Sequence, residues 1–373
     1  MKAHAQPAHA GKLLGLELLR FAAACAVLVW HYQHFAFDGA AIAVQRAQQP
    51  FYVLLRPFYE YGWYGVQVFW AISGFIFFWR YRDSVASGAV GGWRFFVLRF
   101  SRLYPLHLTT LLLVALLQAI YTARSGHAFV YPHNDGWHFL LQLCMASNWG
   151  LQDGYSFNGP IWSISAEVLV YLLFYAGLRM AGRSVVVNLA AVGLAVGLRQ
   201  AGLAGVVSEC AGFFYAGGLG ALLLRRYPPG RAGAVGALAA LAAIGAPLLA
   251  WFSVREPGAN AVVYASLAYA PCLLYCLARP LPLPLGAGAT AAIETAGNLT
   301  YASYLLHFPL QLAIALYFAG RGTAIPVYGK PLFLFFMAAT FGAAYLSYRY
   351  LEAPAQALLR RRLAPTPTNP ART

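Results

Sequence analysis

Charged residues are scarce in this sequence. They make up 10% of the 373 residues, whereas hydrophobic residues make up 60%; soluble globular domains usually carry about 25% charged residues. Acidic residues are the scarcest class, with 11 Asp and Glu against 26 Lys and Arg, which gives a formal net charge of +15. So little charge cannot cover the surface of a water-soluble protein of this length. The composition therefore excludes an ordinary soluble enzyme and predicts an integral membrane protein.

The cysteines and the basic charge are the two features that could indicate another class of protein. The five cysteines are scattered and mostly lie in apolar runs, and Cys272 and Cys276 have no His, Asp or Glu beside them. We interpret them as packing residues and predict no metal site. The positive charge is not gathered in a soluble domain or a groove-reading motif, so we expect no nucleic-acid partner. It is typical instead of membrane topology and of contact with membrane lipids.

Apolar windows bounded by charges or by Pro and Gly clusters predict an all-α, polytopic bundle of about ten transmembrane helices. The windows are 13–37, 62–79, 103–122, 161–179, 184–198, 204–224, 233–253, 260–278, 298–318 and 331–350. The first is too long for the apolar part of a signal peptide and is interpreted as a span. The connections 38–61 and 123–160 are expected to hold short re-entrant or interfacial helices. We expect one transmembrane domain over 1–360, and at 361–373 a basic, then Pro/Thr-rich, disordered cytoplasmic tail.

The distribution of Lys and Arg predicts the orientation of these spans. With a cytoplasmic N-terminus, 18 of these residues fall in cytoplasmic segments and 7 in outside segments, while Arg20 lies inside the first span. The seven outside residues are Arg46, Arg56, Arg124, Arg199, Arg255, Arg321 and Lys330. The bias predicts that both termini are cytoplasmic and that the number of spans is even.

The first span carries ionisable residues at Glu17, Arg20, His31 and His34. Such groups are costly in a membrane unless they face a partner or a wet cavity, so they are functional candidates. Arg20 and His31 are eleven residues apart, about 20° past three full helical turns and about 16 Å along the axis, so they share a face. His34 should be turned by about 60° from His31. The alternative is structural: a Glu17–Arg20 pair near the lipid headgroups and a hydrogen-bonded buried histidine.

His34 also begins a His-x-x-x-Asp pattern that ends at Asp38. Some soluble CoA-dependent acyltransferases use such a pair, but this sequence lacks their two-domain context. We interpret the pattern as a chance match, while His34 itself is expected to line the same cavity as His31.

A cytoplasmic segment after the second span is rich in arginine. Arg99 and Arg102 are three residues apart and lie on one helix face, followed by Leu-Tyr-Pro. Their guanidinium groups offer paired donors of the kind that bind phosphate oxygens. The alternative is that they serve only the positive-inside rule.

Three further ionisable residues lie within or next to later spans. Glu167 is about a turn and a half into the fourth span and requires a buried partner. His307 lies in the middle of the ninth span, where it has either a structural or a functional role. Glu352 follows the last span and could be no more than an interfacial acid beside Arg349.

Six segments of the sequence, in a fixed order, resemble the acyltransferase-3 family of bacterial membrane acyltransferases, which O-acetylate surface polysaccharides, lipopolysaccharide and peptidoglycan. They are the Leu-Leu-Arg start with ten residues between Arg20 and His31, Phe-Trp-Ala-Ile-Ser-Gly-Phe from Phe69, Arg-Phe-Ser-Arg-Leu-Tyr-Pro from Arg99, Trp-Ser-Ile-Ser-Ala-Glu from Trp162, Ser-Tyr-Leu-Leu-His-Phe-Pro from Ser303 and Tyr-Arg-Tyr-Leu-Glu-Ala-Pro from Tyr348. The resemblance runs from Leu16 to about Arg360.

The resemblance implies ten helices in a bacterial inner membrane, and acyl transfer, in the first place of acetyl, from cytoplasmic acyl-CoA to a hydroxyl of a cell-surface or lipid-linked glycan. It maps Arg20 and His31 onto the essential pair of the family, Arg99 and Arg102 onto its cytoplasmic arginine motif, and Glu352 onto the acid of its last motif. Some members carry an additional soluble esterase-like domain. Here the acceptor is expected to reach the membrane site itself, or a separate extracytoplasmic partner protein completes the transfer.

These observations lead to one mechanistic hypothesis. Arg99 and Arg102 would hold the CoA phosphates, and His31 would act as general base on the acceptor hydroxyl or as transient acyl carrier. Arg20 would steady the donor or the oxyanion. Glu352, and less strongly Glu167, would orient these groups. The alternatives are a transporter or flippase for a lipid-linked sugar, and a sensory or scaffolding membrane protein.

Overall fold

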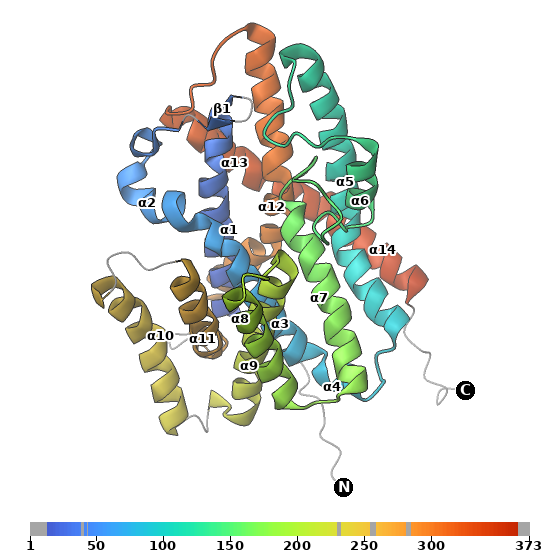
Figure 1. The fold of residues 1–373 in the computed structure, drawn as a ribbon, viewed down its shortest axis with the longest axis vertical. Helices are drawn as coiled ribbons and strands as arrows, with labels where there is room; N and C mark the ends of the chain where they lie inside the picture. The colour runs from blue at the N-terminus through green and yellow to red at the C-terminus, as the bar shows by residue number, and fades with distance from the viewer. Residues whose placement is uncertain are drawn as a thin grey trace.

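The computed structural model describes residues 13–38, 41–42, 44–229, 233–253, 259–280 and 285–364. The regular secondary structure of these residues is almost entirely helical, which confirms the predicted all-α class (Figure 1). The strands within these ranges form one two-stranded antiparallel pair, in which Phe37 of β1 (Phe37–Asp38) lies opposite Ile42 of β2 (Ala41–Ile42).

A helix coincides with each of the ten predicted ranges. The helices are α1 (Leu14–His31), α3 (Gly65–Arg80), α5 (Gly92–Ser125), α7 (Ile161–Met180), α8 (Val185–Gln200), α9 (Val206–Arg226), α10 (Gly233–Ser253), α11 (Ala259–Leu277), α12 (Ala287–Arg321) and α13 (Lys330–Ser347). The predicted connections hold the short helices α2 (Tyr52–Tyr61) and α6 (Gly136–Leu143). The remaining elements are η1 (Tyr32–Ala36), η2 (Arg46–Gln48), η3 (Gly62–Tyr64), α4 (Arg82–Ala86), the π-helical η5 (Tyr348–Glu352) and α14 (Ala353–Leu363).

Six helical segments of the described chain are long and apolar enough to cross a membrane. They are Leu14–Ala36, Gly92–Ser125, Ile161–Met180, Val206–Arg226, Ala287–Arg321 and Lys330–Leu363. Shorter apolar helices lie at Val185–Gln200, Gly233–Gly245 and Val262–Leu277. The membrane character of the chain is thus supported by length and composition. The count of ten spans and the side of each terminus remain predictions.

Small residues bring the central helices α3 and α9 into backbone contact. Gly74 of α3 lies against the backbone of Phe214, and Gly217 of α9 lies against the backbone of Ala71, so that a Cβ at either glycine would overlap the neighbouring carbonyl. Packing of this kind holds membrane helices together because lipid supplies no hydrophobic force between them. The contact fixes one wall of the site described below.

Helix α12 is tied to the start of α7 at its proline. Pro309 has no N–H and cannot bond the carbonyl of Leu305 one turn earlier. The side-chain amide of Asn158, just before α7, donates to that carbonyl instead, at 3.1 Å. This bond explains why an asparagine precedes the Gly-Pro start of the fourth predicted span. It also fixes the middle of α12 against α7.

One end of the bundle is held by an acidic residue among arginines. Asp83 of α4 pairs with Arg82, with Arg183 at 3.5 Å, and with Arg225 at the end of α9. Burial alone would raise the pKa of Asp83, but the hydrogen bond from Arg225 and the three positive charges outweigh it and lower this pKa below its usual value. Helix α4 marks the lower end of the molecule in Figure 1, whereas β1 and α2 lie toward the upper end.

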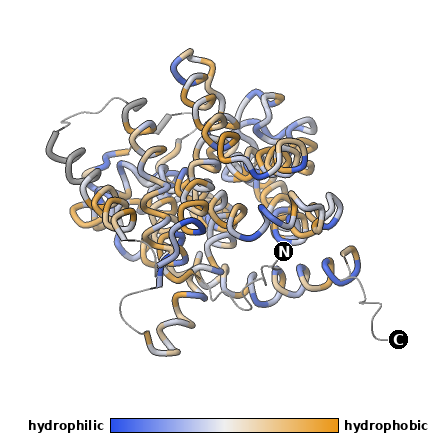
Figure 2. The backbone as a smooth tube through the Cα atoms, turned by 90° about the horizontal axis from the view of Figure 1, so that it is seen from below, coloured by the Kyte–Doolittle hydropathy of each residue, from blue (hydrophilic) through white to orange (hydrophobic). Residues whose placement is uncertain are grey.

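Helix α14 follows the last predicted span directly and continues to Leu363, three residues past the predicted domain end at 360. It leads toward the C-terminus at the edge of the bundle, where hydrophilic and hydrophobic positions alternate along it (Figure 2). Trp93 of α5 donates to the carbonyl of Leu363 at 2.8 Å and so fixes the end of this helix. The rest of the predicted tail, 365–373, lies outside the described residues.

Candidate active site

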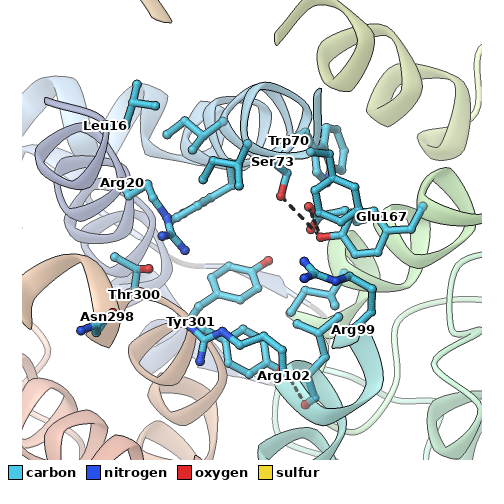
Figure 3. Close-up of a pocket in the computed structure, with 18 of the residues that line it drawn as sticks. Leu16, Arg20, Trp70, Ser73, Arg99, Arg102, Glu167, Asn298, Thr300 and Tyr301 are labelled. Carbon is cyan, nitrogen blue, oxygen red and sulfur yellow. Dashed lines mark hydrogen bonds between the residues drawn. The ribbon is translucent and has the colours of Figure 1, made fainter. Parts of the chain in front are cut away.

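A cavity of about 440 Å³ lies among α1, α3, α5, α7, α12 and α14 (Figure 3). Its lining includes exposed Arg80 where α3 ends, together with Leu13 and Arg99 near the starts of α1 and α5, and we take this end as its mouth. Its far end is reached by Val66 of α3, Ser163 of α7 and Tyr304 of α12. The cavity therefore opens at the end of the bundle that carries α4.

Positive charge dominates the lining of this cavity. Five arginines and two glutamates line it: Arg20, Arg80, Arg99, Arg102, Arg360, Glu17 and Glu167. Arg20 points into it from α1, and Glu167 from the opposite side, with the labelled Arg99 and Arg102 on α5 beside them (Figure 3). An excess of guanidinium groups with aromatic neighbours suits a ligand that carries several phosphates.

Arg99 is held in place by aromatic side chains. Its Nη2 donates to the hydroxyl of Tyr81 at 2.7 Å, and its guanidinium carbon lies 4.8 Å from the ring centre of Phe77 and 4.9 Å from that of Tyr81. Its Nε is buried and has no hydrogen-bond partner. The side chain is thus fixed in position where it lines the cavity.

Arg102 is positioned by Glu352, 250 residues away in the chain. Its Nη1 donates to Oε2 of Glu352 at 3.1 Å, and its guanidinium lies 5.4 Å from the ring centre of Tyr301. Glu352 is 3% exposed and lies behind Arg102, outside the cavity lining. Arg349 bonds to the hydroxyl of Tyr345 instead. Glu352 therefore forms its ion pair with Arg102 and not with Arg349.

Arg20 and Glu167 occupy opposite walls of the cavity. Arg20 forms the predicted pair with Glu17 at 3.3 Å. Glu167 accepts a hydrogen bond from the hydroxyl of Tyr171 at 2.6 Å, and that hydroxyl is 3.4 Å from Oγ of Ser73. Glu167 thus has the buried partner that its position in the span requires.

Tyr304 and Ser163 form the floor of the cavity. Their hydroxyl oxygens are 2.8 Å apart, and the Tyr304 hydroxyl also donates to the carbonyl of Pro160 at 2.8 Å. The ring of Tyr304 lies 6.4 Å from that of Phe69, measured between centres. These contacts close the cavity at the level where α7 begins.

Three histidines lie beyond this floor and form a buried cluster. The ring centre of His31 is 4.7 Å from that of His307, and the two rings are stacked at 26°. The ring centre of His34 is 4.8 Å from that of His31. Gln311 links the cluster: its amide donates to the carbonyl of His31 at 2.8 Å, and its Oε1 lies 3.3 Å from Nδ1 of His34. The structure thus brings together residues from the first and ninth predicted spans.

The position of His34 corrects one expectation from helical geometry. The α-helix ends at His31, and residues 32–36 continue as the 3₁₀ helix η1. A 3₁₀ helix has three residues per turn, so residues i and i+3 lie one above the other. His34 therefore lies on the same side as His31 rather than turned away from it. The side chain of Asp38 lies outside the described residues, so the His-x-x-x-Asp pattern is not tested.

The cavity and the histidine cluster are separate but adjacent. The histidines do not line the cavity, and Tyr304 stands between the two, with its ring centre 5.9 Å from that of His307. Residues 304 and 307 are three apart on α12, about 4.5 Å along the axis. The predicted site is thus divided: Arg20, Arg99, Arg102 and Glu167 line the cavity, whereas His31 lies about one turn beyond its floor.

Some site residues escaped the sequence analysis. Arg360 lines the cavity from α14, where its Nε donates to Ser101 at 3.3 Å. In the sequence it is hidden in a run of three arginines. Tyr301 and Gln311 belong to the site through contacts that only the folded structure shows. Tyr301 lies under the guanidinium of Arg102, and Gln311 donates to the carbonyl of His31. Their spacing from His307, six and four residues, places Gln311 but not Tyr301 on the histidine's face.

No group of three or more His, Cys, Asp or Glu side chains that could hold a metal ion is found among the described residues.

Comparison with known proteins shows the family to which the chain is related. Residues 13–349 match the family model of an acyltransferase domain, that of the acyltransferase-3 family. A stretch of 171 residues is 30% identical to Acyltransferase MdmB of Streptomyces mycarofaciens; it covers 45% of this chain and 40% of that protein, less than half of either. No solved structure matches the chain. The family match covers about nine-tenths of the sequence, including Arg20, His31, Arg99, Arg102 and Glu167. The chain belongs to the acyltransferase-3 family.

Proposed function

We propose that this protein is a membrane O-acyltransferase of the bacterial inner membrane. It moves an acyl group, in the first place acetyl, from cytoplasmic acyl-CoA to a hydroxyl of a cell-surface or lipid-linked glycan. The observation that carries the proposal is the pairing of an arginine-lined cavity with a buried histidine cluster about one turn beyond its floor. A binding site for several phosphates beside a candidate base is what an acyl-CoA-dependent transfer needs.

The mouth of the cavity binds the nucleotide end of the donor. Arg99 and Arg102 contribute the guanidinium N–H groups that Tyr81 and Glu352 do not take, while Glu352 holds Arg102 in place. Arg80 and Arg360 add positive charge at the same end. Guanidinium groups form paired, charge-assisted hydrogen bonds to phosphate oxygens, which anchors this part of the donor and leaves its acyl arm free.

The acyl arm extends from the mouth toward the histidines. Arg20 lies along this route on α1, where it steadies the donor, and Glu167 limits the positive charge that a neutral arm would face. The thioester passes the floor at Tyr304 to reach His31. His31 removes the proton of the acceptor hydroxyl as the oxygen attacks the thioester carbon. Coenzyme A then leaves by the same route.

The acceptor approaches from the opposite end of the bundle. His34 lies within 5.8 Å, ring centre to ring centre, of Tyr131 in the connection between α5 and α6, and 5.4 Å from Phe37 next to β2. The histidine cluster is thus covered by segments from the end away from the cavity mouth. This arrangement supports a donor from one side and a glycan from the other, presented directly or by a separate extracytoplasmic protein.

The test uses purified protein in detergent with acetyl-CoA labelled in the acetyl group. We expect release of CoA and transfer of label to a hydroxyl acceptor such as a lipid-linked glycan extract. A transporter or flippase of lipid-linked sugar would leave acetyl-CoA intact. It would instead move the sugar, without the acetyl label, across the membrane of liposomes. Intact acetyl-CoA after incubation with folded protein and acceptor extract would contradict the proposal.

A further inference from the structure

We infer that His307 is a second catalytic residue: its ring N–H donates a hydrogen bond to the thioester carbonyl oxygen while His31 takes the proton of the acceptor. The inference deepens the proposed function and rests on it. It starts from three ring nitrogens that are buried and have no hydrogen-bond partner, Nδ1 of His31 and both nitrogens of His307. His307 is 0% exposed.

Unpartnered polar atoms of this kind are rare in protein interiors, because burial without a hydrogen bond costs free energy. Three other buried histidines have a partner for at least one nitrogen: His34 has Gln311, His107 has the carbonyl of Gln142 at 2.7 Å, and His138 has Asp135 at 2.7 Å. The carbonyls of Ser303 and Tyr304 approach His307 from its own helix, but neither forms a hydrogen bond of normal geometry with it. The missing partner is therefore a group that arrives with the substrates.

The position of His307 fits the oxygen of the thioester. On α12, Thr300, Tyr304, His307 and Gln311 are spaced at i, i+4, i+7 and i+11, which is one face of the helix. The first two line the cavity and the last holds the carbonyl of His31. His307 is thus the first polar side chain of this face beyond the floor. A donor that passes Tyr304 brings its acyl carbonyl to His307.

The stacking of the two rings allows them to act on one carbon. The centres of the two rings are 4.7 Å apart and their planes differ by 26°. The edges of the His31 ring therefore run beside those of the His307 ring. One nitrogen of each ring can then meet neighbouring atoms of the same reacting group. A neutral imidazole is a competent electrophile, because it polarises a carbonyl through its N–H without becoming charged.

The step balances without any further reactant. The hydroxyl oxygen forms a bond to the thioester carbon, its proton moves to His31, and the carbonyl electron pair moves onto the oxygen that His307 stabilises. The C=O bond then re-forms, the C–S bond breaks, and the thiolate takes the proton from His31. The products are the acyl ester and free CoA, and His307 ends in its starting state.

The test compares three replacements of His307. His307→Phe keeps a stacked ring but has no N–H, whereas His307→Asn and His307→Gln keep a donor. Loss of one oxyanion donor costs about 10²–10³-fold in kcat. We expect this loss in His307→Phe with the KM for acyl-CoA unchanged, and a clearly smaller loss in the better of the two amide variants. His107→Phe is the matched control, since it removes a buried imidazole outside the site, and its folded fraction should keep wild-type kcat.

The outcomes separate the inference from the function on which it rests. A wild-type protein that does not consume acyl-CoA refutes the proposed function. An active wild type with an active His307→Phe variant, or with folded amide variants as inactive as His307→Phe, overturns the inference alone. Where the variants do not fold, infrared spectra of a ¹³C-labelled thioester carbonyl on the wild type decide. A band shifted to lower frequency on binding supports the hydrogen bond, and an unshifted band overturns it.

Discussion

Arg99 and Arg102 each use one guanidinium N–H within the protein, Arg99 toward Tyr81 and Arg102 toward Glu352, and keep the others for a phosphate. Each charge-assisted phosphate contact contributes about 1.5–3 kcal/mol. We expect the double change Arg99→Ala and Arg102→Ala to raise the dissociation constant for acyl-CoA by about tenfold or more, at 1.4 kcal/mol per decade. Isothermal titration of the detergent-solubilised protein measures it. Arg349→Ala, at an exposed arginine outside the cavity, is the control. Unchanged donor affinity with lowered expression would assign the two arginines to topology alone.

On the proposed mechanism, the transfer step depends most on His31. His31→Ala and His31→Gln should lower the transfer rate by about 10²–10⁴-fold, the usual contribution of a general base. Both variants should still purify as a single species and bind acyl-CoA, because the arginines proposed to bind its phosphates are untouched. The rate of acetyl transfer and the binding of CoA are measured on the same preparation. Near-normal transfer by His31→Ala would remove His31 from the mechanism.

His34 gives a graded comparison for the same experiment. Its ring is near His31, but its Nδ1 is paired with Gln311, and Gln311 also holds the backbone of His31. We expect His34→Ala to lower the transfer rate less than His31→Ala and to leave donor binding intact. A loss equal to that of His31→Ala would move the role of base to His34.

The π-helical element η5 sets the position of Glu352 and, through it, that of Arg102. Glu352→Ala removes the partner of Arg102 and should weaken donor binding by about 1.5–3 kcal/mol at most, the value of a hydrogen bond to a charged group. Arg102 is partly exposed, so water offsets some of this loss. Glu352→Gln keeps a hydrogen bond and should lose less. Thermal unfolding and acyl-CoA titration of both variants are compared; equal and wild-type donor affinities in the two would show that η5 does not act on the site.

Helix α12 carries both the floor of the cavity and the histidine behind it. Tyr304→Phe loses the bonds to Ser163 and Pro160 but keeps the ring, whereas Tyr304→Ala also removes the ring between the cavity and His307. We expect Tyr304→Ala to raise hydrolysis of acyl-CoA in the absence of acceptor, relative to transfer in its presence, because water and thioester then meet His31. Tyr304→Phe should change this ratio less. The ratio is obtained from CoA release with and without acceptor, and a ratio in Tyr304→Ala equal to that of wild type would show that the floor is no barrier.

For the whole molecule, the orientation is the prediction that most needs a direct test. Reporter fusions after Arg82 and after Arg362 should both score as cytoplasmic, and one after Gly126 as outside, because the Lys and Arg bias is large. Gly126 ends α5 in a left-handed conformation at φ 76°, the opposite end of α5 from the cavity mouth. An outside score after Arg362 would mean that a span was miscounted, with 184–224 the first place to look.

The sequence predicted those parts of the molecule that depend on local pattern. The apolar runs gave each of the ten helices, and the three-residue spacing placed Arg99 and Arg102 on one face because α5 is regular there. The prediction failed where the backbone conformation changes and no residue in the sequence signals the change. Residues 32–36 contain neither Gly nor Pro, so nothing signals the 3₁₀ turn that brings His34 beside His31. Partners distant in the chain, such as Arg102 and Glu352, are fixed only by folding.

On the proposed function, the location of His31 along α1 determines which of the two substrates enters the membrane. His31 lies 17 residues after Leu14, about 26 Å along the axis at 1.5 Å per residue, while the hydrocarbon core of a bilayer is about 30 Å thick. The reaction is therefore vectorial on the proposed function: the acyl carbon is carried across most of the bilayer while the nucleotide stays at the surface where it bound. A bulky, hydrophilic glycan then needs only to reach the membrane face opposite the cavity mouth. The long, narrow pantetheine chain, which can fit between helices, enters the membrane instead of the glycan.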